Sequence, residues 1–161
     1  MAALAINDPR IDRPSEIRRV TDLLGGKESF ASLPKDSLDV HDMLLQGLPF
    51  QGLAHLIGNL SVIRKTVFLE QAIGMSSQTF QRRRVDPLKP LNREQSSRVW
   101  KFAEILSEAT IVFGSQADAE CWLEQPAIGL NRRRPIDLLA TIAGIEILHE
   151  LLGRLEYGVY A

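Results

Sequence analysis

The 161-residue sequence has few of the residues that several common kinds of site require. Its one cysteine, Cys121, forms no internal disulfide, and a single thiol is typical of a reducing compartment. Its three histidines, His41, His55 and His149, are scattered without metal-ligand spacing. No apolar run reaches the roughly 18 residues that a membrane-spanning helix needs. The sequence therefore favours a cytoplasmic protein with no membrane contact and no metal site.

Sequence motifs of enzymatic chemistry are also missing. His149-Glu150 begins like a zinc-protease motif, but Gly153 stands where the second histidine is required. There is no glycine-rich phosphate loop, no dinucleotide-binding fingerprint and no nucleophile elbow. We therefore expect no catalytic residue and no cofactor, and a function in binding rather than in catalysis.

What the sequence does contain is an uneven distribution of charge. Residues 61–101 carry nine basic and three acidic side chains, a net charge of +6. The flanking residues 1–60 and 102–161 carry net charges of −2 and −5. A basic centre between acidic flanks indicates that one segment binds a polyanion. Charge alone leaves open the alternative of a solvated face with no partner.

Hydrophobic periodicity predicts an all-α fold. Apolar residues recur at helical spacing in most of the chain after residue 37, and no segment alternates in the manner of a strand. Helices are expected over 50–60, 63–73, 76–84, 92–113, 115–122 and from 141 onward. A proline-containing linker, residues 86–90, separates the two halves. The expected organisation is a partly ordered N-terminal arm at 1–37, a helix-turn-helix domain at 38–88 and a second helical domain at 91–161.

Residues 69–82, LEQAIGMSSQTFQR, have the pattern of a helix-turn-helix. Gly74 supplies the positive φ of the tight turn, Met75 fills the core there, and Ser76 caps the second helix. Glutamine and arginine form paired hydrogen bonds with adenine and guanine, and an arginine run contacts phosphates. The expected DNA-binding residues are Ser76, Ser77, Gln78, Thr79, Gln81, Arg82, Arg83 and Arg84.

One residue departs from that pattern. Glu70 stands where the first helix of the motif usually has a small residue, at the point where it crosses the second helix. An ordinary helical hairpin that ends in a solvated arginine cluster is therefore the alternative.

Three segments of the second half occur in the order and spacing of a known family. They are LNREQSSRVWKFAEILSEATIVFG, SQADAECWLEQPAIGL and RRRPIDLLATIAGIEILHELLGRLEYGVYA. Residues 91–161 resemble the Xre/MbcA/ParS antitoxins. Upstream, GLPFQGLAHLI and GMSSQTFQRRR also resemble the N-terminal helices and helix-turn-helix of that family, so the resemblance covers residues 46–161.

The resemblance implies that residues 91–161 form a toxin-binding domain. The partner would be a RES-type toxin, an NAD-degrading enzyme encoded by the neighbouring gene. This chain would mask the active site of that toxin. The toxin–antitoxin complex would bind its own operator DNA, and a palindromic operator would require a homodimer. Two alternatives stay open: a stand-alone dimeric helix-turn-helix transcriptional regulator, and an adaptor whose helix-turn-helix no longer binds DNA.

The resemblance also identifies candidate toxin-binding residues. Arg134 and Asp137 lie in the segment RRRPIDLL, which matches the family's arginine-x-proline-x-aspartate-leucine-leucine turn, and they either contact the toxin or hold the turn together. The polar end of the last helix and the short tail after it are expected to enter the toxin's cleft. That group consists of Arg154, Glu156, Tyr157, Gly158 and Val159.

Overall fold

The structure, a computed structural model, describes residues 13–158, and these residues form an all-helical fold without β-strands, as the sequence predicts. The helices of the first half are α1 (Arg13–Leu23), α2 (Ser37–Gln46), α3 (Phe50–Asn59), α4 (Lys65–Phe68) and α5 (Ser77–Arg83). Those of the second half are α6 (Arg93–Phe113), α7 (Gln116–Glu124) and α8 (Ile142–Glu156). A π-helical turn, η4 (Leu69–Ile73), continues α4. Three 3-10 turns complete the list: η3 (Gly26–Glu28), η5 (Ile128–Leu130) and η6 (Pro135–Ala140).

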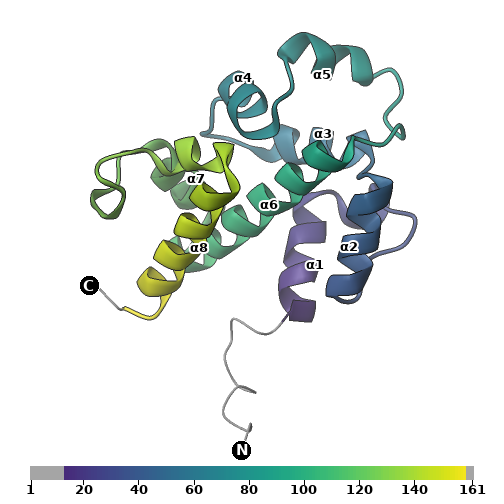
Figure 1. Ribbon diagram of the computed structural model, residues 1–161. Coiled ribbons are helices and arrows are strands. Elements are labelled where there is room, and N and C mark those ends of the chain that lie inside the picture. The colour runs from purple at the N-terminus through teal and green to yellow at the C-terminus, as the bar shows by residue number, and fades with distance from the viewer. Residues whose placement is uncertain (1–12, 159–161) are drawn as a thin grey trace, which may run out of the picture.

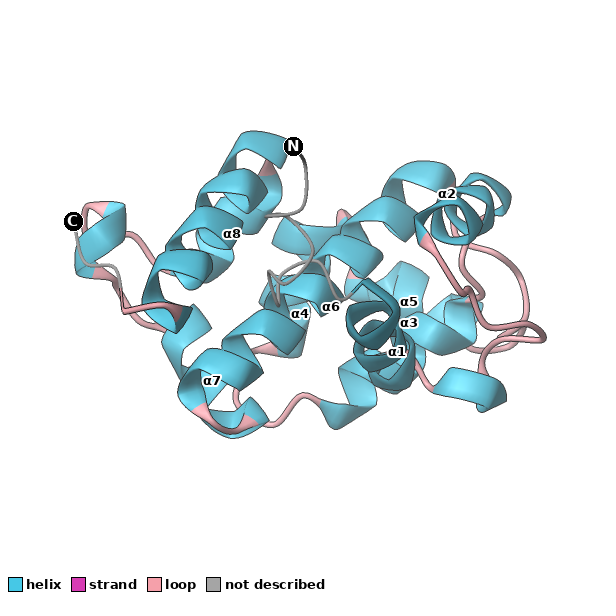
Figure 2. Cartoon of the chain, turned by 90° about the horizontal axis from the view of Figure 1, so that it is seen from below, coloured by secondary structure: helices cyan, strands magenta, loops and turns pink. Residues whose placement is uncertain are grey.

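The longest helix, α6, runs through the middle of the molecule and packs against elements of both halves. It contacts α1, α2 and η4 from the first half and α7 and α8 from the second (Figure 1). The same arrangement is visible from below, where α8 and the pair α1 and α2 lie on opposite sides of α6 (Figure 2). Phe102 of α6 packs against Phe68 of α4 with tilted rings, 4.3 Å between centroids, and both rings are buried. The two halves therefore share one hydrophobic core.

The ends of the helices follow the local signals in the sequence. Asn92 and Gln95 form a capping box at the start of α6, and Ser115 and Thr141 cap α7 and α8 through their side-chain oxygens. Gly114 ends α6 with a φ of 92°. The starts of α6, α7 and α8 and the end of α6 confirm the predicted boundaries. Each of these caps joins residues that are three or four positions apart, so the local sequence is enough to predict it.

The N-terminal arm contributes a helix to the core. The sequence predicts only partial order for residues 1–37, and residues 1–12 lie outside the described part of the chain. In α1, however, Val20 is fully buried, as is Leu24 just after the helix, and α1 packs against α6. Arg19 Nε also donates a hydrogen bond to Ser107 Oγ of α6, at 3.3 Å.

Candidate functional site

The predicted helix-turn-helix segment folds as a helical hairpin with a tight turn. The first helix consists of α4 and η4, and it begins at Lys65, two residues after the predicted start. Gly74 has a φ of 75°, in the left-handed region where glycine is favoured, and ends this helix. Met75 is buried, and its N–H donates to the carbonyl of Leu69 at 2.9 Å. The turn residues therefore have the conformation and burial that the sequence predicts for them.

The departure at Glu70 has a structural explanation. Glu70 lies in the π-helical turn η4 and is exposed to solvent, whereas Leu69, Ala72 and Ile73 of the same turn are buried. The small residue at the inner face of this turn is thus Ala72.

The second helix of the hairpin, α5, is short and anchored from beneath. Ser76 accepts a hydrogen bond from the N–H of Thr79 at 3.2 Å, which confirms its capping role. Phe80 is buried and packs on Phe50 of α3, with ring centroids 5.0 Å apart. This anchor leaves one face of α5 at the surface, where Ser77, Gln78, Gln81 and Arg82 surround a shallow open depression.

The three consecutive arginines of α5 are not equivalent. Arg82 and Arg84 are exposed, and the guanidinium of Arg84 lies 5.5 Å from the centre of the Phe80 ring. Arg83 instead turns toward the linker, donates to the carbonyl of Pro90 at 2.7 Å and lies 5.9 Å from the Phe50 ring. The phosphate contact expected of Arg83 stays a prediction, and in the structure Arg83 also ties the linker to the hairpin.

In the second half, Arg134 and Asp137 form ion pairs within the protein. Arg134 donates to both carboxylate oxygens of Asp137, at 2.9 and 3.1 Å, and to Glu124 Oε2 at 3.3 Å. The hydrogen bond and charge of Asp137, followed by the charge of Glu124, raise the pKa of Arg134 above its ordinary value. Of the two roles left open by the sequence, the turn-holding one has direct contacts in the structure. Asp137 keeps 41% of its side chain exposed.

The predicted plug lies at the far end of the molecule from α5. Arg154, Glu156, Tyr157 and Gly158 are exposed at the end of α8, near the C-terminus in Figure 1. Val159 lies outside the described residues. The structure therefore separates the two predicted surfaces, with α5 at one end and the last turn of α8 at the other.

A buried glutamate that the sequence did not single out joins the two halves. Glu120 of α7 is 0% exposed, and its Oε1 accepts the N–H groups of Ser61, Val62 and Ile63 at 2.9, 3.0 and 3.2 Å. These three residues lie in the loop that leads from α3 into the hairpin. A glutamate in a polar helix normally predicts a solvent-facing residue, so only the folded chain shows this contact.

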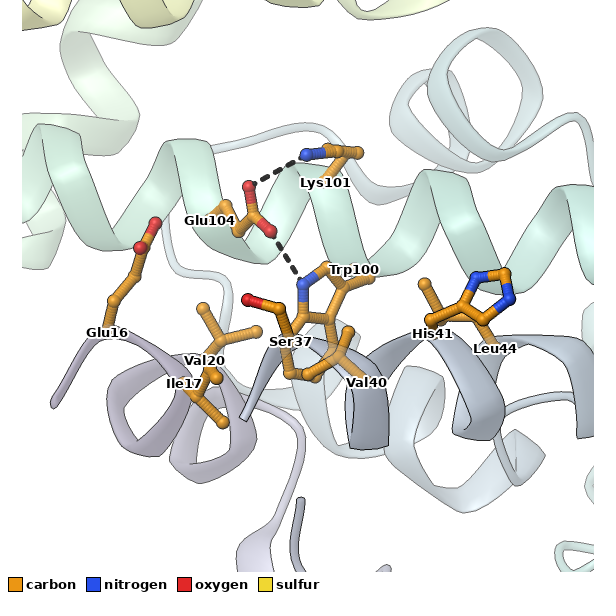
Figure 3. A pocket seen from close by; sticks show the side chains of 10 residues that line it. All are labelled: Glu16, Ile17, Val20, Ser37, Val40, His41, Leu44, Trp100, Lys101 and Glu104. Carbon is orange, nitrogen blue, oxygen red and sulfur yellow. Dashed lines mark hydrogen bonds and ion pairs between the residues drawn. The ribbon is translucent and has the colours of Figure 1, made fainter. Parts of the chain in front are cut away.

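A pocket of about 220 Å³ lies between α1, α2 and α6, away from both predicted surfaces. In Figure 3 the carboxylate of Glu104 lies between the indole of Trp100 and the ammonium of Lys101. Trp100 Nε1 donates to Glu104 at 2.6 Å, and Lys101 Nζ donates to it at 3.1 Å. None of the predicted DNA-binding or toxin-binding residues lines this pocket.

Glu104 also faces His149 of α8. The ring of His149 lies 3.6 Å from Glu104 Oε2 through Nε2 and 2.8 Å from Glu108 Oε2 through Nδ1. Burial lowers the pKa of His149, but the hydrogen bond with Glu108 and the charges of Glu108 and Glu104 outweigh burial and the opposing charge of Lys101. The net result is a pKa above the ordinary value of 6.5.

This pKa predicts a pH-dependent contribution of His149 to stability. A pKa that is higher in the folded than in the unfolded state stabilises the fold below the unfolded pKa, and this contribution disappears as pH rises through the folded pKa. We expect His149→Gln to lower the free energy of unfolding more below pH 6.5 than at about pH 9. Urea unfolding of both proteins across this range measures the difference. A His55→Gln variant serves as control, and an equal loss at both pH values would contradict the assignment.

No helix in the described part of the chain has the length and apolar character needed to cross a membrane. Within residues 13–158 the structure also brings together no group of three or more His, Cys, Asp or Glu side chains able to hold a metal ion.

Comparisons with known proteins relate this structure to antitoxins. Residues 108–158, which contain α7, η6 and α8, match the family described as the antitoxin Xre/MbcA/ParS C-terminal toxin-binding domain. An antitoxin Xre of Yersinia enterocolitica is 34% identical over 92 residues, which are 56% of this chain and 62% of that protein. An antitoxin Xre of Photorhabdus laumondii is 29% identical over 118 residues, or 73% of this chain and 78% of that protein.

A longer and more distant match is the "Prs ADP-ribosylating antitoxin" of a Sphingobium species. It is 24% identical over 144 residues, which cover 84% of this chain and 87% of that protein. The matches to named antitoxins thus extend beyond the C-terminal domain into the hairpin and the N-terminal helices. Through residues 108–158, the chain is similar to the toxin-binding domain of the Xre/MbcA/ParS antitoxins.

Proposed function

We propose that this protein neutralises a RES-type toxin that consumes NAD, by masking the toxin's active site, and that it represses its own operon through the α4–α5 hairpin. The observation that carries the proposal is the match of residues 108–158 to a toxin-binding domain whose final helix ends at the surface. That helix end presents Arg154, Glu156 and Tyr157, with Tyr157 44% exposed. A short, polar, exposed segment of this kind suits entry into a cleft.

The proposed DNA contacts rest on the exposed face of α5. Gln78, Gln81 and Arg82 would meet base edges in the major groove, Ser77 and Arg84 would contact phosphates, and Ser76 and Thr79 would hold the start of the helix. Two such hairpins on a palindromic operator must lie about 34 Å apart, one turn of B-DNA. The proposal therefore includes a homodimer, formed in the cytoplasm together with the toxin.

A variant of this function follows from the name of the Sphingobium relative, which refers to ADP-ribosylation of Prs. ADP-ribosylation transfers ADP-ribose from NAD to an acceptor and releases nicotinamide. A toxin that modifies a protein and a toxin that only hydrolyses NAD both consume NAD, but only the first leaves ADP-ribose on a protein. Detection of ADP-ribosylated protein in toxin-expressing cells distinguishes the two.

The test is co-expression of this chain with the RES-type protein encoded beside it, scored by growth and by cellular NAD. We expect the neighbour alone to stop growth and deplete NAD, and the full chain to restore both. A chain lacking residues 154–161 is expected to lose the rescue, because it lacks the proposed plug. The same truncation should leave operator binding by the purified antitoxin largely intact, since α5 lies at the other end of the molecule.

Other outcomes would contradict this assignment of roles. If the neighbour is harmless, or the full chain gives no rescue, the toxin-masking function is wrong, and a dimeric transcriptional regulator becomes the better interpretation. If the truncated chain still neutralises the toxin but no longer binds the operator, the roles proposed for the two surfaces are wrong.

A further inference from the structure

The loop between α7 and η6 has an unusual backbone. Asn131 and Arg132 have φ values of 52° and 64°, and they are the only non-glycine residues with positive φ in the described part of the chain. This conformation costs a residue with a side chain on the order of 1 kcal/mol. Two such residues in succession persist only where the surroundings hold them in place.

Hydrogen bonds hold this loop in one conformation. The carbonyl of Ala127 accepts the N–H groups of Leu130 and Arg132, at 3.1 and 2.9 Å, and the N–H of Ala127 donates to the carbonyl of Arg133 at 3.0 Å. Leu130 is buried and anchors the loop in the core. A strained backbone that hydrogen bonds and a buried side chain hold in one conformation is typical of a segment that positions side chains for binding.

The loop presents an apolar side chain to solvent. Ile128 is 93% exposed, the largest exposure of any large hydrophobic residue in residues 14–158. Its neighbour Gly129 lies against Leu151 of α8, where a side chain on Gly129 would come within 3.2 Å of Leu151 Cδ1. One turn earlier on α8, Ile147 is 45% exposed. Ile128 thus projects into solvent from a loop that lies against α8 through Gly129.

The charge of the loop indicates what chemistry would cover it. Arg132 and Arg133 are both exposed in the same loop as Ile128, whereas residues 102–161 as a whole carry a net charge of −5. A complementary surface is an apolar pocket flanked by carboxylates. A pocket for NAD must have a positive potential to attract the diphosphate, and this potential would repel the two arginines. The loop fits a part of a partner that lies outside such a pocket.

We propose that the Ile128 loop, residues 127–133, is a second docking site for the toxin, in which Ile128 enters an apolar pocket and Arg132 and Arg133 pair with carboxylates around it. This inference rests on the proposed function, because the toxin is the partner to which it assigns the loop. The loop lies inside the segment that matches a toxin-binding domain, residues 108–158. It would supply affinity, whereas the end of α8 would block the active site.

The test measures Kd between the purified full chain and the purified RES-type protein encoded beside it. We expect Ile128→Ala to raise Kd about tenfold and Ile128→Asp to raise it at least about a hundredfold, as for the anchor of an interface. The double variant Arg132→Asn, Arg133→Ser should slow association about tenfold and weaken its salt dependence. Asparagine is chosen at position 132 because it tolerates positive φ.

The matched control is Leu38, which is 74% exposed in α2. Helix α2 lies on the other side of α6 from α8 (Figure 1). Leu38→Ala and Leu38→Asp should leave Kd unchanged, and thermal unfolding should show that all variants fold as the parent does. If Ile128→Asp binds as tightly as the parent, or the Leu38 variants weaken binding equally, the docking site is wrong while the antitoxin function stands. If the unaltered chain does not bind the RES-type protein at all, the proposed function itself fails.

Discussion

Alanine at Gln78, Gln81 and Arg82 together is expected to lower the affinity for the operator at least about a hundredfold. Each good paired contact with a base edge contributes about 1–3 kcal/mol, so three contacts contribute about 3–9 kcal/mol, whereas a hundredfold change in affinity corresponds to about 2.8 kcal/mol. The fold should persist, because all three side chains are exposed while Ser76 caps α5 and Phe80 anchors it. Alanine also favours helix, so α5 itself is not weakened.

Fluorescence anisotropy with a labelled fragment of the operon's promoter measures this effect, with and without toxin and at stated salt. Gln125→Ala, an exposed glutamine after α7, is the matched control and should bind as the parent does. Binding that the triple substitution leaves unchanged would show that α5 is not the recognition helix. Absence of promoter binding in both the parent and the triple variant would favour the adaptor interpretation.

Arg83 is the informative comparison within the same helix. It contacts the linker carbonyl of Pro90 and the ring of Phe50, so its loss should act mainly through stability and not through base recognition.

The second large effect is expected from Glu120→Ala, which should lower the free energy of unfolding by about 3 kcal/mol. The substitution leaves the N–H groups of Ser61, Val62 and Ile63 without their acceptor, and each buried polar group without a partner costs about 1–3 kcal/mol. The expected loss of unfolding free energy lies near the lower limit of the summed cost of the three N–H groups, because Ser61 and Val62 are exposed and gain hydrogen bonds from water. For a protein of this size the melting temperature should fall by about 6–12 °C.

Urea and thermal unfolding measure the loss at Glu120. Glu120→Gln should cost less, since its amide oxygen still accepts from the loop. Glu146→Ala, an exposed glutamate of α8, should change stability by less than about 0.5 kcal/mol. A loss at Glu120→Ala as small as that at Glu146→Ala would mean that the loop does not depend on this carboxylate.

The contrast between Ser76 and Arg83 shows which part of the candidate site was predictable. Ser76 caps α5 by accepting from the N–H three residues ahead, and Gly74 turns the chain through its own φ, so both roles are visible in a few letters of sequence. Arg83 differs from Arg82 only in the direction in which it leaves a short helix. That direction depends on the positions of Phe50 and the linker, which the local sequence does not determine.

The helices and their caps follow from the sequence, because helical periodicity and capping depend on residues within one or two turns of each other. The burial of Glu120, the place of α1 in the core and the exposure of Ile128 depended on the tertiary structure. Each results from contacts or gaps between segments far apart in the chain, such as the 57 to 59 residues that separate Glu120 from the loop that it holds. A local sequence pattern does not determine which distant backbone segment a given side chain will contact.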